Sequence, residues 1–369
     1  MKRLQLEQIL KDLEKKMVFL VGPRQVGKTW LAKQIGTHYK NWIYLNYDNN
    51  QHRKIILNHE WVDDVDLIVF DEIHKMENWK NFIKGIFDTR LDHQHILVTG
   101  SARLDAFNQT GDSLAGRFFR HHLFPFSISE CKANNVNKIV ARLINRGGFP
   151  EPFLAESDVE SERWRYQYIN GLIREDILDF EFIHNLSKIK SLIELLKERV
   201  GSPISYASLA RDLELHAATI KKYIMILESL FIVFLVRPFS RSIARTILKE
   251  PKIYFYDVGL ITHDKGAQFE NLVALHLLQK VTISTDYYGK DEQLHYLRTK
   301  DNKEVDFALV RDEKLTLLIE CKYKKSEIAQ QLYYFSNKYD VDGIQLVCEI
   351  KNEIQKGRIK VLDVNKYFN

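Results

Sequence analysis

Apolar and polar residues alternate in blocks along the first 130 residues of the chain. The short, uniformly apolar runs have the length of buried strands, and the segments between them have the spacing of amphipathic helices. An alternation of strand and helix is typical of a parallel sheet with helices on both faces. We therefore expect an α/β domain over residues 1–130, with helices at residues 4–16 and 29–35 and strands at residues 17–21, 42–45, 65–70 and 95–99.

The pattern changes twice in the remainder of the chain. Residues 131–186 are expected to form a helical linker, interrupted by a Gly-Gly-Phe-Pro sequence at residues 147–150. Residues 187–260 predict two helices and then a hairpin, which is the outline of a winged helix. Residues 261–369 return to an α/β pattern. The expected helices lie at residues 204–210, 217–230, 267–279 and 328–338, and the strands at residues 231–237, 252–256, 295–298, 304–310, 315–322 and 344–348.

The bulk composition narrows the class of protein. A chain of 369 residues with 45% hydrophobic residues has the size for two or three domains with packed cores. The three cysteines are far apart and form no CxxC pair, so neither a disulfide framework nor a zinc site is expected. No apolar run approaches the roughly 18 residues of a membrane helix, and none follows the N-terminus as in a signal peptide. The sequence therefore predicts a cytoplasmic protein without a membrane partner.

Positive charge is concentrated in the middle of the chain. Residues 187–250 hold eleven Lys and Arg against six Asp and Glu, which equals the whole net charge of +5. Arg241, Arg245 and Lys249 recur every four residues, and Lys221 and Lys222 lie early in the second helix of the expected winged unit. Such charge suits DNA phosphates, but a solvated surface or a protein-contact module has the same pattern. DNA and a protein partner both remain open.

A phosphate-binding loop is the most specific motif. Residues 22–29 fit GxxxxGK[ST] and lie between an expected strand and an expected helix, which is the context the motif requires. Backbone N–H groups and the helix N-terminus would hold phosphate, Lys28 would reach the β- and γ-phosphates, and Thr29 would ligate Mg²⁺. The residues expected to bind ATP are Gly22, Pro23, Arg24, Gln25, Val26, Gly27, Lys28 and Thr29.

Two adjacent acids end the apolar run at residues 65–70. About 40 residues after a phosphate-binding loop, such a strand would deliver Asp71 to the outer shell of the magnesium ion. Glu72 would then polarise the attacking water as the general base. Ser101, after the next strand, is a candidate for sensing the γ-phosphate, although helix capping explains it equally well. Arg117 is a candidate arginine finger acting on a neighbouring subunit, and a plain surface arginine is the alternative.

The ordered set of motifs resembles a known family. GPRQVGKT, LIVFDEIHK, ILVTGSAR, SLAGR and LFPFSISE are similar to segments of prokaryotic AAA-type ATPases that carry a C-terminal DUF4143 region. YFYDVGL, GAQFEN, LRTKDNKEVDFAL and LLIECK resemble the C-terminal half of the same family, so the resemblance covers nearly the whole chain. It implies a P-loop ATPase domain, a winged helix and a C-terminal domain with a restriction-endonuclease-like fold.

The C-terminal block also contains a candidate second site. Glu320 and Lys322 share one face of a strand, Asp306 lies on the preceding strand, and Glu270 comes from an earlier helix. In a nuclease core of this type, Asp306 and Glu320 would hold Mg²⁺ with help from Glu270, and Lys322 would steady the attacking water. Alternating Glu and Lys is also ordinary on an exposed strand, and such folds can serve as binding modules.

Three functions follow from these observations. The first is a Mg-dependent ATPase that acts on DNA through its winged-helix and nuclease-like domains. The second is a nucleotide-dependent switch for a protein partner, with a catalytically silent C-terminal domain. The third is a metal-dependent DNA nuclease gated by ATP. A homo-oligomer is compatible with each, because AAA-type sites often form between subunits.

Overall fold

The computed structural model describes residues 3–100, 114–131, 136–177, 185–240, 250–324, 327–350 and 352–368. The chain divides into two compact units. Unit 1 consists of residues 1–124 with the short segments 229–231 and 286–288, and unit 2 consists of the remaining residues. Within the described parts of the chain, no helix is both long enough and apolar enough to cross a membrane.

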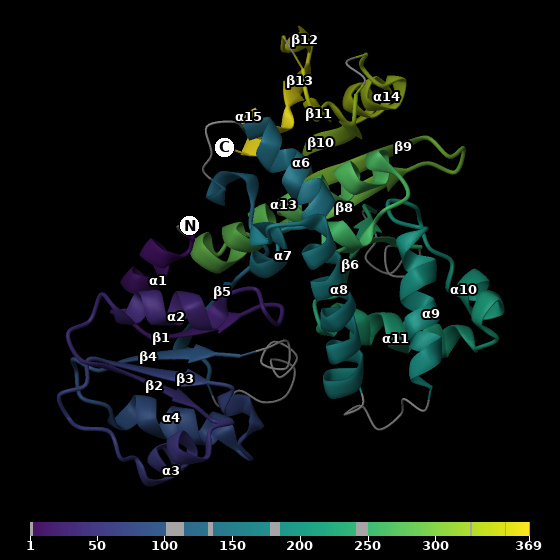
Figure 1. Ribbon diagram of the computed structural model, residues 1–369. Coiled ribbons are helices and arrows are strands. Elements are labelled where there is room, and N and C mark those ends of the chain that lie inside the picture. Colours follow the sequence, from purple (N-terminus) through teal and green to yellow (C-terminus); the bar gives the residue numbers. More distant parts are fainter. Residues whose placement is uncertain are drawn as a thin grey trace. The chain divides into compact units, whose positions relative to one another are not determined.

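Unit 1 is built on a five-stranded parallel sheet, which confirms the predicted α/β fold. The strand order is β2-β3-β4-β1-β5, and every neighbouring pair is parallel. Figure 1 shows α1 and α2 on one face of this sheet and α3 and α4 on the other. The strands are β1 (Met17–Val21), β2 (Trp42–Asn46), β3 (Leu67–Asp71), β4 (His95–Thr99) and β5 (Phe118–His122), and the helices are α1 (Leu6–Leu13), α2 (Lys28–Gly36), α3 (Asn50–Asn58), the 3₁₀ helix η1 (Ile73–Lys75) and α4 (Trp79–Thr89).

Burial explains why these strands appear as continuous apolar runs. Every residue of β1 and β3 is buried, because helices cover both faces of the sheet. On the face of α3 and α4, Phe19 and Phe70 pack with Ile56 and Trp79 in one apolar cluster. Strand β5 was not predicted, since its sequence FFRHH mixes apolar and charged residues. It lies at the edge of the sheet, where most of its residues are only partly buried.

The first half of unit 2 is mainly helical in its described residues. Gly147 adopts a φ of 70°, which ends α6 and lets Pro150 start the next helix. The elements are η3 (Ile128–Glu130), α6 (Val136–Arg146), α7 (Pro150–Leu154), α8 (Asp158–Leu172), the π-helical turn η4 (Ile173–Ile177) and α9 (Leu186–Lys197).

A helix-turn-helix and an antiparallel strand pair follow α9. Helix α10 (Tyr206–Leu213) is capped by the Ser205 side chain and ends at Glu214, which has a left-handed φ of 54°. A turn of three residues separates α10 from helix α11 (Ala217–Ser229). Strand β6 (Val233–Pro238) then pairs with β7 (Lys252–Phe255). The predicted strand at residues 231–237 starts two residues later, because Phe231 has a left-handed φ of 55°. Arg241, Arg245 and Lys249 lie outside the described residues.

An eight-stranded mixed sheet joins this strand pair to the C-terminal part of unit 2. Its order is β12-β13-β11-β10-β9-β8-β6-β7, in which β9 is antiparallel to β8 and β10. The remaining strands are β8 (Glu292–Arg298), β9 (Glu304–Arg311), β10 (Lys314–Lys322), β11 (Gly343–Val347), β12 (Ile354–Lys356) and β13 (Ile359–Asp363), and the helices are η5 (Val258–Leu260), α13 (Lys265–Tyr288), α14 (Gln330–Tyr339) and α15 (Val364–Phe368).

Helix α13 is longer than predicted. The sequence predicted a helix at residues 267–279, but α13 extends to Tyr288 and ends at Gly289, which has a φ of 62°. Residues 281–285, Val-Thr-Ile-Ser-Thr, have low helix propensity, so the pattern suggested an earlier end. Buried packing of Val281 and Ser284 accompanies the continuation of the helix. Tertiary packing therefore overrides local propensity here.

Candidate functional site

The predicted phosphate-binding loop joins β1 to α2 at one edge of the sheet of unit 1. Gly22 has a φ of 150°, and a Cβ atom there would lie 2.3 Å from the carbonyl oxygen of Leu123. Gly27 has a φ of 100° and is the N-cap residue of α2, so a side chain there would be strained. Both glycines are thus required by the backbone path, and the loop delivers Lys28 to the first turn of the helix.

Two cations hold the loop in shape. The buried Lys28 donates from Nζ to the carbonyl oxygens of Gly22 (2.9 Å) and Pro23 (2.6 Å), so its side chain turns back across the loop. The buried Arg3 donates from Nη2 to the carbonyl oxygens of Val26 (2.6 Å) and Phe124 (3.0 Å). Sequence reasoning did not find Arg3, because a single arginine 23 residues away from Val26 carries no local signal.

The Asp71 carboxylate is the centre of a hydrogen-bond network at the same edge. Its Oδ2 atom accepts from the Thr29 hydroxyl (3.2 Å), from the Tyr44 hydroxyl and from Nδ2 of Asn46 (3.3 Å). Its Oδ1 atom accepts from the Thr99 hydroxyl (2.5 Å). Four elements, α2, β2, β3 and β4, therefore fix one carboxylate beside the loop. Tyr44 and Asn46 were not predicted, although strand alternation places both on the same side of β2.

Glu72 follows Asp71 at the end of β3 and has a backbone conformation that is uncommon for a residue other than glycine. It has a left-handed φ of 56°, and its N–H donates to the Thr99 carbonyl oxygen at 3.0 Å. Burial raises the pKa of Glu72, and the neighbouring Asp71 charge raises it further. The Lys75 ammonium, 3.8 Å from Glu72 Oε2, acts in the opposite direction. The carboxyl group is thus partly shielded from water, and it holds a proton more readily than an exposed glutamate does.

Of the two other predicted residues, Ser101 lies outside the described residues, and Arg117 is not brought to this edge. Arg117 directly precedes β5, and Phe118 is in register with Met17 at the start of β1, whereas Gly22 follows the end of β1. Five strand residues separate the two ends, or about 16 Å at 3.3 Å per residue. The Arg117 guanidinium instead pairs with Asp88, with Nε at 2.8 Å from Oδ1.

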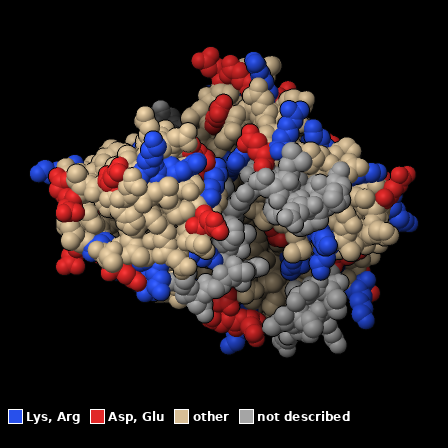
Figure 2. All heavy atoms as spheres, turned by 90° about the horizontal axis from the view of Figure 1, so that it is seen from below, with Lys and Arg blue, Asp and Glu red and all other residues tan. Residues whose placement is uncertain are grey.

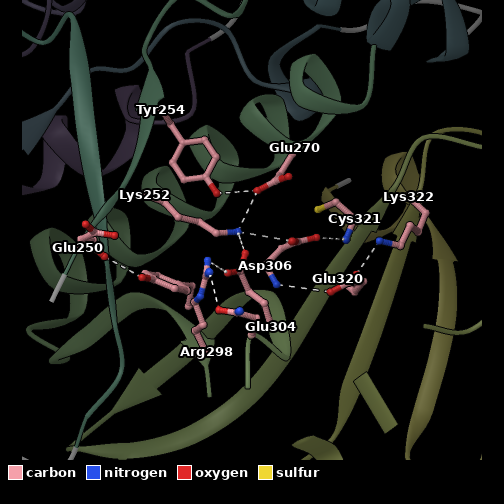
Figure 3. A network of polar contacts seen from close by, with 12 residues as sticks. Glu250, Lys252, Tyr254, Glu270, Arg298, Glu304, Asp306, Glu320, Cys321 and Lys322 are labelled. Atoms are coloured by element: carbon pink, nitrogen blue, oxygen red, sulfur yellow. Dashed lines mark hydrogen bonds and ion pairs between the residues drawn. The ribbon is translucent and has the colours of Figure 1, made fainter. Parts of the chain in front are cut away.

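The four predicted residues of the C-terminal site do converge in unit 2. Figure 3 shows Asp306 on β9 between Glu270 on α13 and Glu320 on β10, with Lys322 beside Glu320. Lys322 Nζ donates to Glu320 Oε1 at 2.6 Å, and the Asp306 N–H donates to Glu320 Oε2 at 3.4 Å. The Cys321 N–H donates to Asp306 Oδ2 at 2.9 Å. The predicted hairpin of β9 and β10 therefore closes the gap between Asp306 and Glu320.

A lysine that sequence reasoning missed lies at the centre of this cluster. Lys252 on β7 is 0% exposed, and its ammonium points at the carboxylates (Figure 3). Its Nζ atom lies 2.7 Å from Glu304 Oε1, 3.3 Å from Glu270 Oε1 and 3.6 Å from Asp306 Oδ1. The Tyr254 hydroxyl donates to Glu270 Oε1 at 2.7 Å. We call Lys252, Glu270, Glu304, Asp306, Glu320 and Lys322 the lysine–carboxylate cluster.

Burial and mutual repulsion change the proton affinities of these acids. Burial is the main cause that raises the pKa of Glu270 to about 7 and that of Glu320 to about 7, and the Asp306 charge adds to both. Lys252 opposes the shift of Glu270, and Lys322 opposes that of Glu320. The three carboxylates around Lys252 raise its pKa despite burial, so the ammonium stays charged.

The arrangement does not fit a magnesium ion as it stands. Among the described residues, no group of three or more His, Cys, Asp and Glu side chains is placed to hold a metal ion together. The Lys252 ammonium occupies the space that Glu270 and Asp306 face. The cluster resembles a nuclease site in residue types, but its central cation is part of the chain.

Comparisons with known proteins define the parts of the chain. Residues 14–132 match the family model described as AAA domain. Residues 137–270 match a domain of unknown function, DUF8612, and residues 265–367 match another, DUF4143. The AAA match covers the sheet of unit 1 together with the phosphate-binding loop and Asp71. Unit 1 is thus a domain of the nucleotide-binding P-loop ATPase class.

The chain as a whole combines this AAA domain with a C-terminal DUF4143 region, as its motifs predicted. An uncharacterized protein of Methanocaldococcus jannaschii is 26% identical over 357 residues, which span 86% of this chain and 77% of that protein. An uncharacterized protein of Mycobacterium tuberculosis is 25% identical over 301 residues, which span 79% of this chain and 66% of that protein.

Solved structures give a weaker likeness. The Walker-type ATPase of Pyrococcus abyssi aligns with a TM-score of 0.45 and 14% identity, over 70% of this chain and 94% of that one. A RuvB structure of Thermotoga maritima aligns with a TM-score of 0.31 and 17% identity, over 62% of this chain and 87% of that one.

Proposed function

We propose that the chain binds Mg-ATP at residues 22–29 and hydrolyses it with the help of Asp71 and Glu72. The observation that carries this proposal is the meeting of Lys28, Thr29 and the two acids at one edge of a parallel sheet. Strand ends are where ligands bind in open α/β sheets. The AAA match over residues 14–132 supports the same conclusion.

The contacts of the loop indicate what each residue does when nucleotide binds. The Lys28 ammonium exchanges its bonds to Gly22 and Pro23 for phosphate oxygens, so the site is shaped before binding. The Thr29 hydroxyl, which lies 3.2 Å from Asp71, would hold the magnesium ion together with Asp71. A magnesium ion bound there neutralises charge on the phosphates.

Glu72 is the candidate general base for the attacking water. Its raised pKa makes the carboxylate a better proton acceptor near neutral pH than an ordinary glutamate. The network of Thr99 and Tyr44 holds the adjacent Asp71, which fixes the end of β3 from which Glu72 projects. Tyr44 and Thr99 are positioning residues in this scheme.

Phosphate release from Mg-ATP tests the proposal. We expect turnover by the wild type, none by Lys28→Ala and little by Glu72→Gln, while Lys40→Ala, a change at an exposed lysine of the same unit, keeps normal turnover. Binding of a fluorescent ATP analogue should be lost in Lys28→Ala and kept in Glu72→Gln. Unchanged turnover in Lys28→Ala would refute the assignment of the loop.

A second function, contact with DNA, is favoured by the middle of unit 2. Helices α10 and α11 with strands β6 and β7 have the order of a winged helix, and α11 exposes Lys221, Lys222 and Met225. We infer that α11 is the helix that contacts DNA. On the face shown in Figure 2, the described Lys and Arg side chains are interspersed with Asp and Glu. That face therefore gives no separate support for DNA binding, and the proposal rests on the exposed residues of α11.

Anisotropy of a labelled duplex, measured over a range of salt concentrations, tests this contact. The double variant Lys221→Ala, Lys222→Ala should weaken binding and reduce the salt slope by about two phosphate contacts. Lys356→Ala with Lys360→Ala, two exposed lysines of β12 and β13, is the matched control. Equal binding by the two double variants would favour a protein partner for this helix.

A further inference from the structure

We propose that the Lys252 ammonium is the resident cation of the lysine–carboxylate cluster and that it takes the place of a divalent metal ion. The C-terminal domain therefore binds no Mg²⁺ or Mn²⁺ at Glu270, Asp306 and Glu320, and it does not cleave nucleic acid by metal-dependent hydrolysis. This inference rests on the geometry of unit 2 and is independent of ATP hydrolysis in unit 1.

The ammonium pairs with two of the three carboxylates that a metal ion would need, those of Glu270 and Asp306. An ammonium has three N–H donors, and Lys252 has one carboxylate oxygen from each of Glu270, Glu304 and Asp306 between 2.7 and 3.6 Å from Nζ. A magnesium ion would require such oxygens at about 2.0–2.1 Å in near-octahedral geometry. The same Oε1 of Glu270 and Oδ1 of Asp306 cannot turn to a metal ion without leaving the lysine.

The remaining oxygens of Asp306 and Glu320 also have donors. Oδ2 of Asp306 accepts from the Cys321 N–H at 2.9 Å. Oε1 of Glu320 accepts from Lys322 at 2.6 Å, and its Oε2 accepts from the Asp306 N–H at 3.4 Å. The two contacts with Asp306 join β9 to β10, and the Lys322–Glu320 contact joins two residues on the same side of β10. The two carboxylates central to the nuclease pattern are thus already engaged.

Charge balance points the same way. The cluster has four carboxylates, on Glu270, Glu304, Asp306 and Glu320, and it has three cations once Arg298, 3.0 Å from Glu304 Oε2, is counted with Lys252 and Lys322. With every group ionised, four negative and three positive charges leave one excess negative charge, and a proton on Glu270 or Glu320, whose pKa values are about 7, removes it. A divalent ion added to this set would overcompensate that charge and would lie next to a buried ammonium, which repels it.

Burial also holds the Lys252 side chain against the carboxylates. The residue is fully buried on β7, and its Nζ atom lies 5.5 Å from the centre of the Tyr296 ring. Its backbone pairs with Val236 of β6 and forms a bridge with Pro203. Moving the ammonium away from the carboxylates inside this packing would leave a buried charge without its partners, which is strongly unfavourable.

Binding of Mn²⁺ without nucleotide, measured by electron paramagnetic resonance, tests the proposal. The Asp71→Asn variant serves as background, because it removes the carboxylate of the unit 1 site. In this background, the additional change Asp306→Asn should leave the number of bound Mn²⁺ ions unaltered. One equivalent of Mn²⁺ that is bound in Asp71→Asn and lost with Asp306→Asn would overturn the proposal.

A second comparison asks whether the lysine itself keeps the metal ion out. Lys252→Met in the same background should gain one bound Mn²⁺, and Asp306→Asn should remove it again. A folded Lys252→Met protein that gains no Mn²⁺ would contradict the role given to the ammonium. If this variant does not fold, the comparison between Asp71→Asn and its Asp306→Asn derivative decides the matter on a chain with Lys252 in place.

Discussion

Replacing Lys252 with methionine is expected to destabilise unit 2 by about 3–5 kcal/mol at pH 8, the usual cost of removing one partner from a buried ion pair. Methionine matches the length of the lysine stem, so packing around Tyr254 and Tyr296 changes little. The loss comes from three carboxylates, on Glu270, Glu304 and Asp306, that no longer have a common cation.

The size of this loss should depend on pH. The pKa of Glu270 is about 7 with the lysine present, and removal of the ammonium would raise it further. The folded variant then binds protons that the unfolded chain, with an ordinary glutamate pKa near 4.3, does not bind. Below the raised pKa of Glu270, each extra bound proton restores about 1.4 kcal/mol of folding free energy per pH unit, until the pH reaches the ordinary glutamate pKa near 4.3. Lys252→Met should therefore lose less stability at pH 6 than at pH 8.

Hydrogen exchange of peptides from β9 and β10 measures the local free energy of opening in unit 2 without assuming that the two units unfold together. Lys366→Met is the matched control, because the Lys366 side chain is 70% exposed and its ion pair with Glu353 is a surface pair. Surface pairs contribute about 0–1 kcal/mol. Equal protection of the β9 and β10 amides in Lys252→Met and Lys366→Met would show that Lys252 does not stabilise the carboxylates. A loss of protection in Lys252→Met that grows as the pH falls would show the same.

Three further predictions concern pH and oligomeric state. Because the pKa of Glu72 is raised, ATP turnover should fall with decreasing pH at an apparent pKa above the ordinary 4.3, and the residual turnover of Glu72→Gln should lack this limb; a wild-type limb at or below 4.3 would contradict it. The His276 ring accepts from the Ile128 N–H, and burial lowers its pKa to about 4. The stability that neutral His276 provides should be complete above about pH 6.5 and decline by about 3 kcal/mol toward pH 4, whereas His276→Gln, measured by urea unfolding, should lack this decline; the same decline in both would assign it to other groups. Arg117→Ala should leave turnover per subunit unchanged at the lowest protein concentration, since Arg117 lies at the opposite sheet edge from its own loop; a loss there would place it at the site of its own chain.

The parts of the structure that sequence could predict are those set by local spacing. The loop at residues 22–29 and strands β1 and β4 were found with their correct ends, because uniform burial gives an unbroken apolar run. The meeting of Asp306 and Glu320 followed from the length of the connection between two strands. In each case the residues lie close together in the chain or follow the spacing of a single strand or helix.

The parts that sequence missed depend on contacts between distant segments. Arg3 reaches the loop from the N-terminal segment, and Tyr44 reaches Asp71 from the neighbouring strand. Lys252 precedes Asp306 by 54 residues and lies on β7, which two other strands separate from β9 in the strand order. Arg3 and Lys252 belong to no local sequence pattern. Tyr44 alternates with Asn46 along β2, but this alternation does not indicate which residue of the neighbouring strand it contacts.

Binding and hydrolysis of ATP by unit 1 can be read from the nucleotide that remains bound after incubation with Mg-ATP. Wild type, Lys28→Ala and Glu72→Gln would be incubated with labelled ATP, freed of unbound nucleotide and extracted. We expect ADP on the wild type, ATP on Glu72→Gln and no nucleotide on Lys28→Ala. ADP on Glu72→Gln at the wild-type level would remove Glu72 as the base, and nucleotide on Lys28→Ala would contradict the binding site itself.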